Sequence, residues 1–179
     1  EMQRLIDSNE LELPEENIER KMYWKTKKIL EKNGFKQYEI SNFAKKGYES
    51  RHNLDCWNQE EYAGMGLAAH SYIDRKRFSN IDNIDEYIKN KNNLNKNIVV
   101  NEIQKKEDQA KEYMMIGFRK IDGISISEFE RKFRINPLFY FRFEIDNLVE
   151  KGLIEVDLDR IKLTKKGLDF ANIVFEEFV

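Results

Sequence analysis

The chain has 179 residues, of which 40% are hydrophobic and 12% aromatic, so it can build a substantial core and is not a disordered polymer. Its 31 basic and 33 acidic residues give a net charge of only −2, which argues against a surface for nucleic acid or an acidic membrane. With one cysteine, no apolar run near the roughly 20 residues of a membrane helix and no signal-peptide pattern at its start, the sequence predicts a cytoplasmic protein without a transmembrane segment.

The first part of the chain predicts a helix followed by an extended segment. Pro14 and the two glutamates after it are typical of a helix start, and apolar side chains keep helical spacing as far as Lys32. Gly34 is placed to end that helix. Phe35 to Ala44 then reads as extended, and this order of helix, glycine and strand favours an α/β fold.

A second strand is predicted over Gly64 to Ile73, with small residues on one of its faces. Gly64, Gly66, Ala68 and His70 alternate with larger side chains, so one face lacks bulk. Glycine weakens a strand unless something approaches the backbone closely, which favours a ligand or another backbone on that face. As a nucleotide-binding fingerprint the two glycines are weak, because the third glycine and the following helix are missing.

The next elements are a hairpin partner, a short helix and a link. Arg75 to Asn80 is predicted to pair with the preceding strand, and Asn83 with Glu86 resembles a capping box that opens a short helix. Lys89 to Asn97 is interpreted as the end of that helix and a solvated link.

The second half predicts three helices, a hairpin and a final helix. The expected elements are a helix over 102–118, a short helix capped by Ser125 or Ser127, a helix from Pro137 to before Gly152, strands around 153–156 and 160–163, and a last helix capped by Thr164. This order is typical of a winged-helix-like unit. We therefore expect two domains, residues 1–101 and residues 102–179.

The helix that would enter a DNA groove lacks the basic residues such a role needs. Residues 137–151 are rich in aromatic and acidic side chains, so we expect no nucleic-acid partner. Its aromatic residues are interpreted as core.

Residues 51–72 hold both histidines, the only cysteine and one of the two tryptophans. We expect His52 in a loop beside the sheet, where it either ligates a metal or haem iron through a neutral ring nitrogen or bonds to backbone or water. Asn53 either orients that ring or closes a turn. Cys56 is either a thiolate ligand or a small apolar side chain, and Trp57 either stacks on a flat macrocycle or caps a core.

Three motifs in this region, taken in order, resemble one family. They are Tyr38-Glu39-Ile40-Ser41-Asn42-Phe43-Ala44, His52-Asn53-Leu54-x-x-Trp57 and Gly64-x-Gly66-x-x-Ala69-His70-Ser71-Tyr72. Together they resemble the oxygen-independent coproporphyrinogen III oxidase-like radical S-adenosylmethionine proteins, and most of all their haem-chaperone branch, HemW.

The resemblance implies a fold and a set of cofactors. It implies the C-terminal portion of a partial (β/α) barrel, followed by a small winged-helix-like domain, hence α/β plus α+β. Full-length members carry a 4Fe–4S cluster, bind S-adenosylmethionine and, in the chaperone branch, haem. The three-cysteine motif that holds the cluster is absent here, so the resemblance implies a fragment without radical chemistry of its own. Because half a barrel exposes strand edges, the fragment is expected to self-associate.

The resemblance also assigns residues. His52, Asn53, Cys56 and Trp57 match a haem-binding motif, with cysteine where tyrosine is expected. Gly64, Gly66, Ala68 and His70 match a strand near the S-adenosylmethionine end of the barrel. The leading hypothesis is haem binding and transfer to a receiving protein. The alternatives are coproporphyrinogen oxidation by the full-length protein and a non-catalytic interaction module in residues 102–179.

Overall fold

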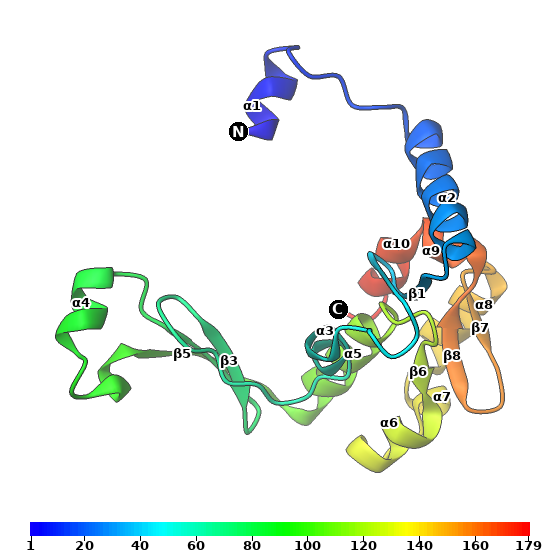
Figure 1. Cartoon of the computed structure of the whole chain (residues 1–179). Coiled ribbons are helices and arrows are strands. Elements are labelled where there is room, and N and C mark those ends of the chain that lie inside the picture. The colour runs from blue at the N-terminus through cyan, green and yellow to red at the C-terminus, as the bar shows by residue number, and fades with distance from the viewer. The chain divides into compact units, whose positions relative to one another are not determined.

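The computed structural model describes residues 1–179 apart from the side chain of residue 101 (Figure 1). The backbone divides into two compact units, Glu1–Glu49 and Ser50–Val179. Both units mix helices with small sheets, which confirms the expectation of a mixed fold. Each unit is described by itself below.

The first unit contains two helices and a hairpin. Its elements are α1 (Met2–Asp7), α2 (Glu16–Lys32), β1 (Lys36–Glu39) and β2 (Asn42–Ala44). Helix α2 confirms the predicted helix, and Gly34 follows its end with a positive φ of 80°.

The predicted single extended segment over 35–44 is instead an antiparallel hairpin of β1 and β2. Buried Glu39 accounts for the turn, because one of its carboxylate oxygens accepts hydrogen bonds from the backbone N–H of Ser41 (3.0 Å) and the side-chain amide of Asn42.

The second unit begins with one helix, a three-stranded sheet and a short helix between its strands. The elements are α3 (Arg51–Trp57), β3 (His70–Ile73), β4 (Lys76–Asn80), α4 (Ile84–Lys89), the 3-10 helix η1 (Leu94–Asn97) and β5 (Ile98–Ile103). The strand order is β3-β4-β5, and both pairs are antiparallel. The hairpin and the Asn83 cap of α4 are confirmed, since the Asn83 side chain accepts the Glu86 N–H.

The remaining elements form the C-terminal part of this unit. They are α5 (Lys106–Gly117), β6 (Ile124–Ser125), α6 (Ile126–Phe133), α7 (Pro137–Tyr140), α8 (Arg142–Glu150), β7 (Ile154–Val156), β8 (Arg160–Leu163), α9 (Lys165–Asp169) and α10 (Ala171–Glu176). Ser125 and Thr164 cap α6 and α9 as predicted, each accepting a backbone N–H. The three strands form an antiparallel sheet in the order β6-β8-β7.

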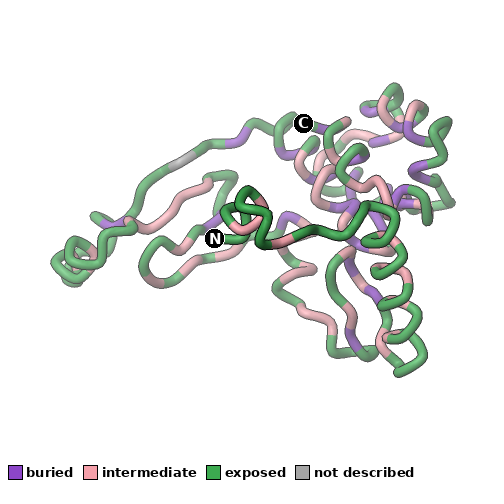
Figure 2. The backbone as a smooth tube through the Cα atoms, turned by 90° about the horizontal axis from the view of Figure 1, so that it is seen from above, coloured by how far each residue is buried: buried purple, intermediate pink, exposed green. Residues whose placement is uncertain are grey.

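The main core lies between these C-terminal helices and their sheet. Phe118, Phe129 and Phe178 are fully buried there, and aromatic rings contact one another across the helices. Figure 2 shows this concentration of buried residues in purple, whereas the β3–β4 hairpin is mostly intermediate or exposed. Within the described backbone, no helix is both long and apolar enough to cross a membrane.

Two further predictions about elements are wrong. Only His70–Ile73 of the predicted strand from Gly64 is a strand, because Gly66 (φ 103°) and Ala68 (φ 55°) adopt left-handed backbone that a strand does not allow. Residues 102 and 103 belong to β5 and not to a helix. All strand pairs in the described backbone are antiparallel.

The aromatic residues of 137–151 are only partly core. Phe141 is 3% exposed, but Phe139 and Phe143 are 80% and 87% exposed, and Tyr140 is exposed as well. The helix breaks at Phe141, and residues two positions to either side of a buried helical side chain lie on the opposite face. The expectation that all these rings are buried is therefore wrong.

Candidate functional site

The predicted haem-binding residues lie on helix α3 and not in a loop. Ser50 caps this helix, since its hydroxyl accepts a hydrogen bond from the backbone N–H of Asn53 (3.3 Å). The prediction of a loop is wrong because the sequence from Arg51 to Trp57 contains no glycine or proline and follows a strong capping residue. The backbone of Asn53 thus contributes to the cap, and its side chain is half-buried.

The helix brings His52 and Cys56 together. They are one turn apart, and the His52 Nε2 atom lies 3.9 Å from the Cys56 Sγ atom. His52 is exposed and Cys56 is half-buried. The rings of His52 and Tyr62 form a T-shaped pair, with 6.4 Å between their centroids. Burial, with the neighbouring Asp55 charge, raises the pKa of the Cys56 thiol.

Trp57 lies on a different face of α3. Five positions along a helix correspond to a rotation of about 140°, so His52 and Trp57 point in different directions. The Arg119 guanidinium sits 4.4 Å from the centre of the Trp57 ring, and the indole Nε1 is buried with no hydrogen-bond partner among the described residues. The structure therefore brings His52 and Cys56 together but turns Trp57 towards the C-terminal part of the unit.

Glu112 of α5 is the centre of a polar network that holds the surrounding segments. Its carboxylate pairs with Arg77 of β4 and accepts hydrogen bonds from the side-chain amides of Gln104 and Gln59. Gln109, one turn earlier, donates to the Tyr72 hydroxyl (3.1 Å). These bonds connect the segment that follows α3, the β3–β4 hairpin and helix α5.

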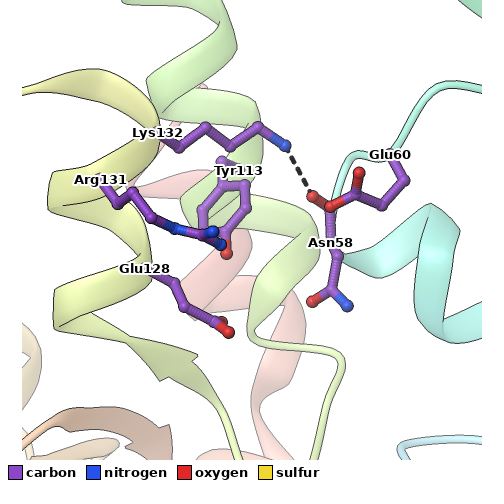
Figure 3. A pocket seen from close by; sticks show the side chains of 6 residues that line it. All are labelled: Asn58, Glu60, Tyr113, Glu128, Arg131 and Lys132. Carbon is purple, nitrogen blue, oxygen red and sulfur yellow. Dashed lines mark hydrogen bonds between the residues drawn. The ribbon is translucent and has the colours of Figure 1, made fainter.

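A pocket of about 370 Å³ opens between the end of α3 and helix α6 (Figure 3). The residues that line it include both acidic and basic side chains. They are Asn58, Glu60, Tyr113, Glu128, Arg131 and Lys132. The Lys132 ammonium donates to the backbone carbonyls of Asn58 and Gln59, both at 2.8 Å. Beside it, buried Lys120 donates to the Asn58 side chain, and desolvation lowers the pKa of Lys120 to about 8.

The glycine-rich segment is a turn that leads into β3. A side chain at Gly64 would come within 2.1 Å of the His70 carbonyl oxygen, so the close approach that requires this glycine comes from the chain itself. A side chain at Gly66 would meet nothing within 4 Å, and Ala68 is exposed. His70 is exposed at the start of β3, opposite Ser79. Open space thus remains at Gly66 and Ala68 but not at Gly64.

The donor set does not suit an iron–sulfur cluster. Cys56 is the only cysteine, and no group of three histidine, cysteine or acidic side chains in the described residues could hold a metal. The chain therefore supplies no ligand set for a cluster.

Residues 104–170 match the HemN C-terminal domain family. The chain is 36% identical to the "Heme chaperone HemW" of Lactococcus lactis over 172 residues, which cover 94% of this chain and 44% of that protein. It is also 36% identical to the HemW of Bacillus subtilis, with 98% of this chain and 46% of that protein covered.

The chain is similar to the haem chaperones HemW over nearly its whole length. This confirms the resemblance inferred from the motifs. The chain spans less than half the length of these curated relatives. Its fold is similar to that of the Escherichia coli protein described as "Coproporphyrinogen III oxidase (HemN)", a "Radical SAM enzyme", with a TM-score of 0.66 and 17% identity over 87% of this chain and 39% of that one.

Sequence reasoning missed the residues that position α3. Arg119 and Glu112 come from segments far from the motif, whereas Tyr62 lies five residues after Trp57, and no local pattern connects any of the three with it. The spacing of His52 and Cys56, four residues apart, was the one available signal, because that spacing places both side chains on one helical face.

Proposed function

We propose that this chain is the C-terminal part of a HemW-type haem-binding protein, in which His52 provides the axial bond to haem iron. The observation that supports it is a histidine on an exposed helical face, within a chain that is 36% identical to haem chaperones over nearly its whole length. An exposed imidazole can offer a neutral ring nitrogen to the iron without reorganising a core. In the bound state haem would supply a planar macrocycle and one iron coordination position.

The other motif residues have separate roles in this proposal. Cys56 is a neighbour of His52 and a second donor on the same face, while Trp57 anchors α3 through Arg119 and does not stack on the porphyrin. Asn53 supports the cap. Gly66, Ala68 and His70 border open space near the proposed S-adenosylmethionine end of the barrel, and Gly64 shapes the turn.

The finer fold assignment is also proposed. We infer that residues 102–179 form a winged-helix-like domain and that residues 1–101 complete a partial (β/α) barrel with the remainder of a full-length protein. The order α5, β6, α6, α8, β7 and β8, with a three-stranded antiparallel sheet, supports the first assignment. A receiving protein for haem and a reducing cytoplasm complete the proposal, in keeping with one free cysteine.

Haem titration tests the role of His52. We expect the His52→Ala chain to bind haem at least about tenfold more weakly than wild type and with an altered Soret band, because it lacks the axial nitrogen. The matched control is His70→Ala, which removes the other exposed histidine and should leave both readouts unchanged. Equal affinity and identical spectra for wild type and His52→Ala would remove His52 from the ligand role.

Coproporphyrinogen oxidation is the second candidate, favoured by the similarity of fold to HemN. Such an activity would require the cluster-binding part that this chain lacks. An anaerobic assay of the reconstituted full-length protein distinguishes the two candidates: formation of protoporphyrinogen with methionine and 5′-deoxyadenosine would favour the enzyme over the chaperone.

A further inference from the structure

The exposed face of α3 carries two metal-ligating side chains at chelating distance. His52 Nε2 and Cys56 Sγ are 3.9 Å apart, and both come from one helical turn, so no long-range folding is needed to hold them together. They include the only thiol of the chain and one of its two imidazoles.

We propose that His52 and Cys56 form a two-ligand site for a borderline divalent cation of the Zn²⁺ type. In tetrahedral zinc sites a Zn–N bond of about 2.1 Å and a Zn–S bond of about 2.3 Å place nitrogen and sulfur about 3.6 Å apart. The observed distance exceeds this value by only about 0.3 Å, which small side-chain rotations remove. Imidazole with thiolate is a donor pair that zinc accepts readily.

The chemistry of binding is a proton exchange without redox change. The Cys56 thiol releases its proton to solvent as the metal–sulfur bond forms, and the neutral His52 ring donates its Nε2 lone pair. No third histidine, cysteine or acidic side chain of the described residues joins the pair, so water completes the coordination.

The cation proposal does not rest on the proposed haem function, although both use His52. Zinc bound to Nε2 withdraws that atom from haem iron, so the cation is expected to compete with haem. The metal titration below contains no haem, and its failure would leave the haem proposal standing. Conversely, a haem titration without dependence on His52 would not affect the cation site.

Cobalt is a suitable probe because Co²⁺ takes zinc sites and a cobalt–thiolate bond gives a charge-transfer band in the near ultraviolet. We expect one Co²⁺ per reduced chain with that band, displaced by Zn²⁺. Cys56→Ser should abolish the band, His52→Ala should weaken binding by at least about tenfold, and Glu107→Gln, at an exposed carboxylate of α5, should change neither. Far-ultraviolet circular dichroism establishes that each variant folds.

A second measurement uses wild-type protein only and so does not depend on the folding of a variant. Reversible blocking of Cys56 as a methyl disulfide should remove the cobalt band, and reduction followed by desalting should restore it. The proposal is overturned if wild type gives no thiolate band with millimolar Co²⁺, or if His52→Ala binds cobalt as tightly as wild type.

Discussion

Residues 51–105 and residues 106–178 belong to one compact unit but are stabilised in different ways. The C-terminal segment buries phenylalanine, leucine and isoleucine side chains from several helices against a sheet. Among the described side chains of residues 51–105, Tyr72 is the one buried hydrophobic residue, and the other buried side chains are polar. Hydrophobic burial stabilises the C-terminal segment. Residues 51–105 depend instead on hydrogen bonds and an ion pair to side chains of α5.

This difference bears on where the candidate site lies. Segments with few buried apolar contacts open at lower free energy than a packed core. The candidate ligands His52 and Cys56 are on the segment with fewer such contacts, while their helix is tied to the core by Trp57 and by polar contacts at its end. We expect the hydrophobic core to stay folded when the polar network is changed. We do not expect the polar network to persist when the core is disrupted.

Phe129→Ala should give the largest effect. This fully buried ring contacts Tyr113, Phe133 and Phe141, so its loss should lower the free energy of unfolding by about 3–5 kcal/mol in urea denaturation. The control is Phe139→Ala, at a ring that is 80% exposed, with an effect within about 0.5 kcal/mol. Similar losses for the two variants would contradict the division into core and exposed rings.

Glu112→Gln should give an intermediate and local effect. It removes the charge that pairs with Arg77 and is expected to cost about 1–2 kcal/mol. Hydrogen exchange should accelerate in β3 and β4 while protection of α8 and β8 remains unchanged. Exposed Glu107→Gln, on the same helix, is the control and should leave exchange as it is. Uniform acceleration throughout the unit would show that the two segments unfold together.

Lys120→Met should change the pH dependence of stability. The pKa of Lys120 is lowered from 10.5 to about 8 in the folded chain, so the unfolded chain binds more protons between these values. Wild-type stability should therefore rise with pH in this window, by up to about 2 kcal/mol relative to Lys120→Met. Urea denaturation below pH 8 and near pH 10 measures the difference.

The control for this variant is exposed Lys106→Met, which should follow the wild-type pH profile. Parallel profiles for wild type and Lys120→Met would show that the Lys120 ammonium is solvated as well in the folded chain as in the unfolded one.

Local signals in the sequence were sufficient to predict much of the secondary structure of the C-terminal segment. The caps at Ser125 and Thr164, and the hairpin of β7 and β8, each follow from residues within a few positions of one another. The same holds for α2 and for the Asn83 cap of α4.

Non-local contacts explain most of what sequence reasoning missed. Strand β5 is defined by its pairing with β4, and the turn at Gly64 by the carbonyl of His70. The concentration of histidines and cysteine in 51–72 predicted a candidate region, and the structure places His52 and Cys56 close together within it. It could not show that Trp57 turns away, because that depends on the helical phase and on Arg119.

The position of Trp57 beneath Arg119 has a practical consequence. The chain has only two tryptophans, Trp24 in the first unit and Trp57 in the second, so each unit carries its own intrinsic fluorophore. A chain with Trp24→Phe would emit from α3 alone. Because the indole is partly shielded and stacked on a cation, its emission would report directly when that helix detaches from α5.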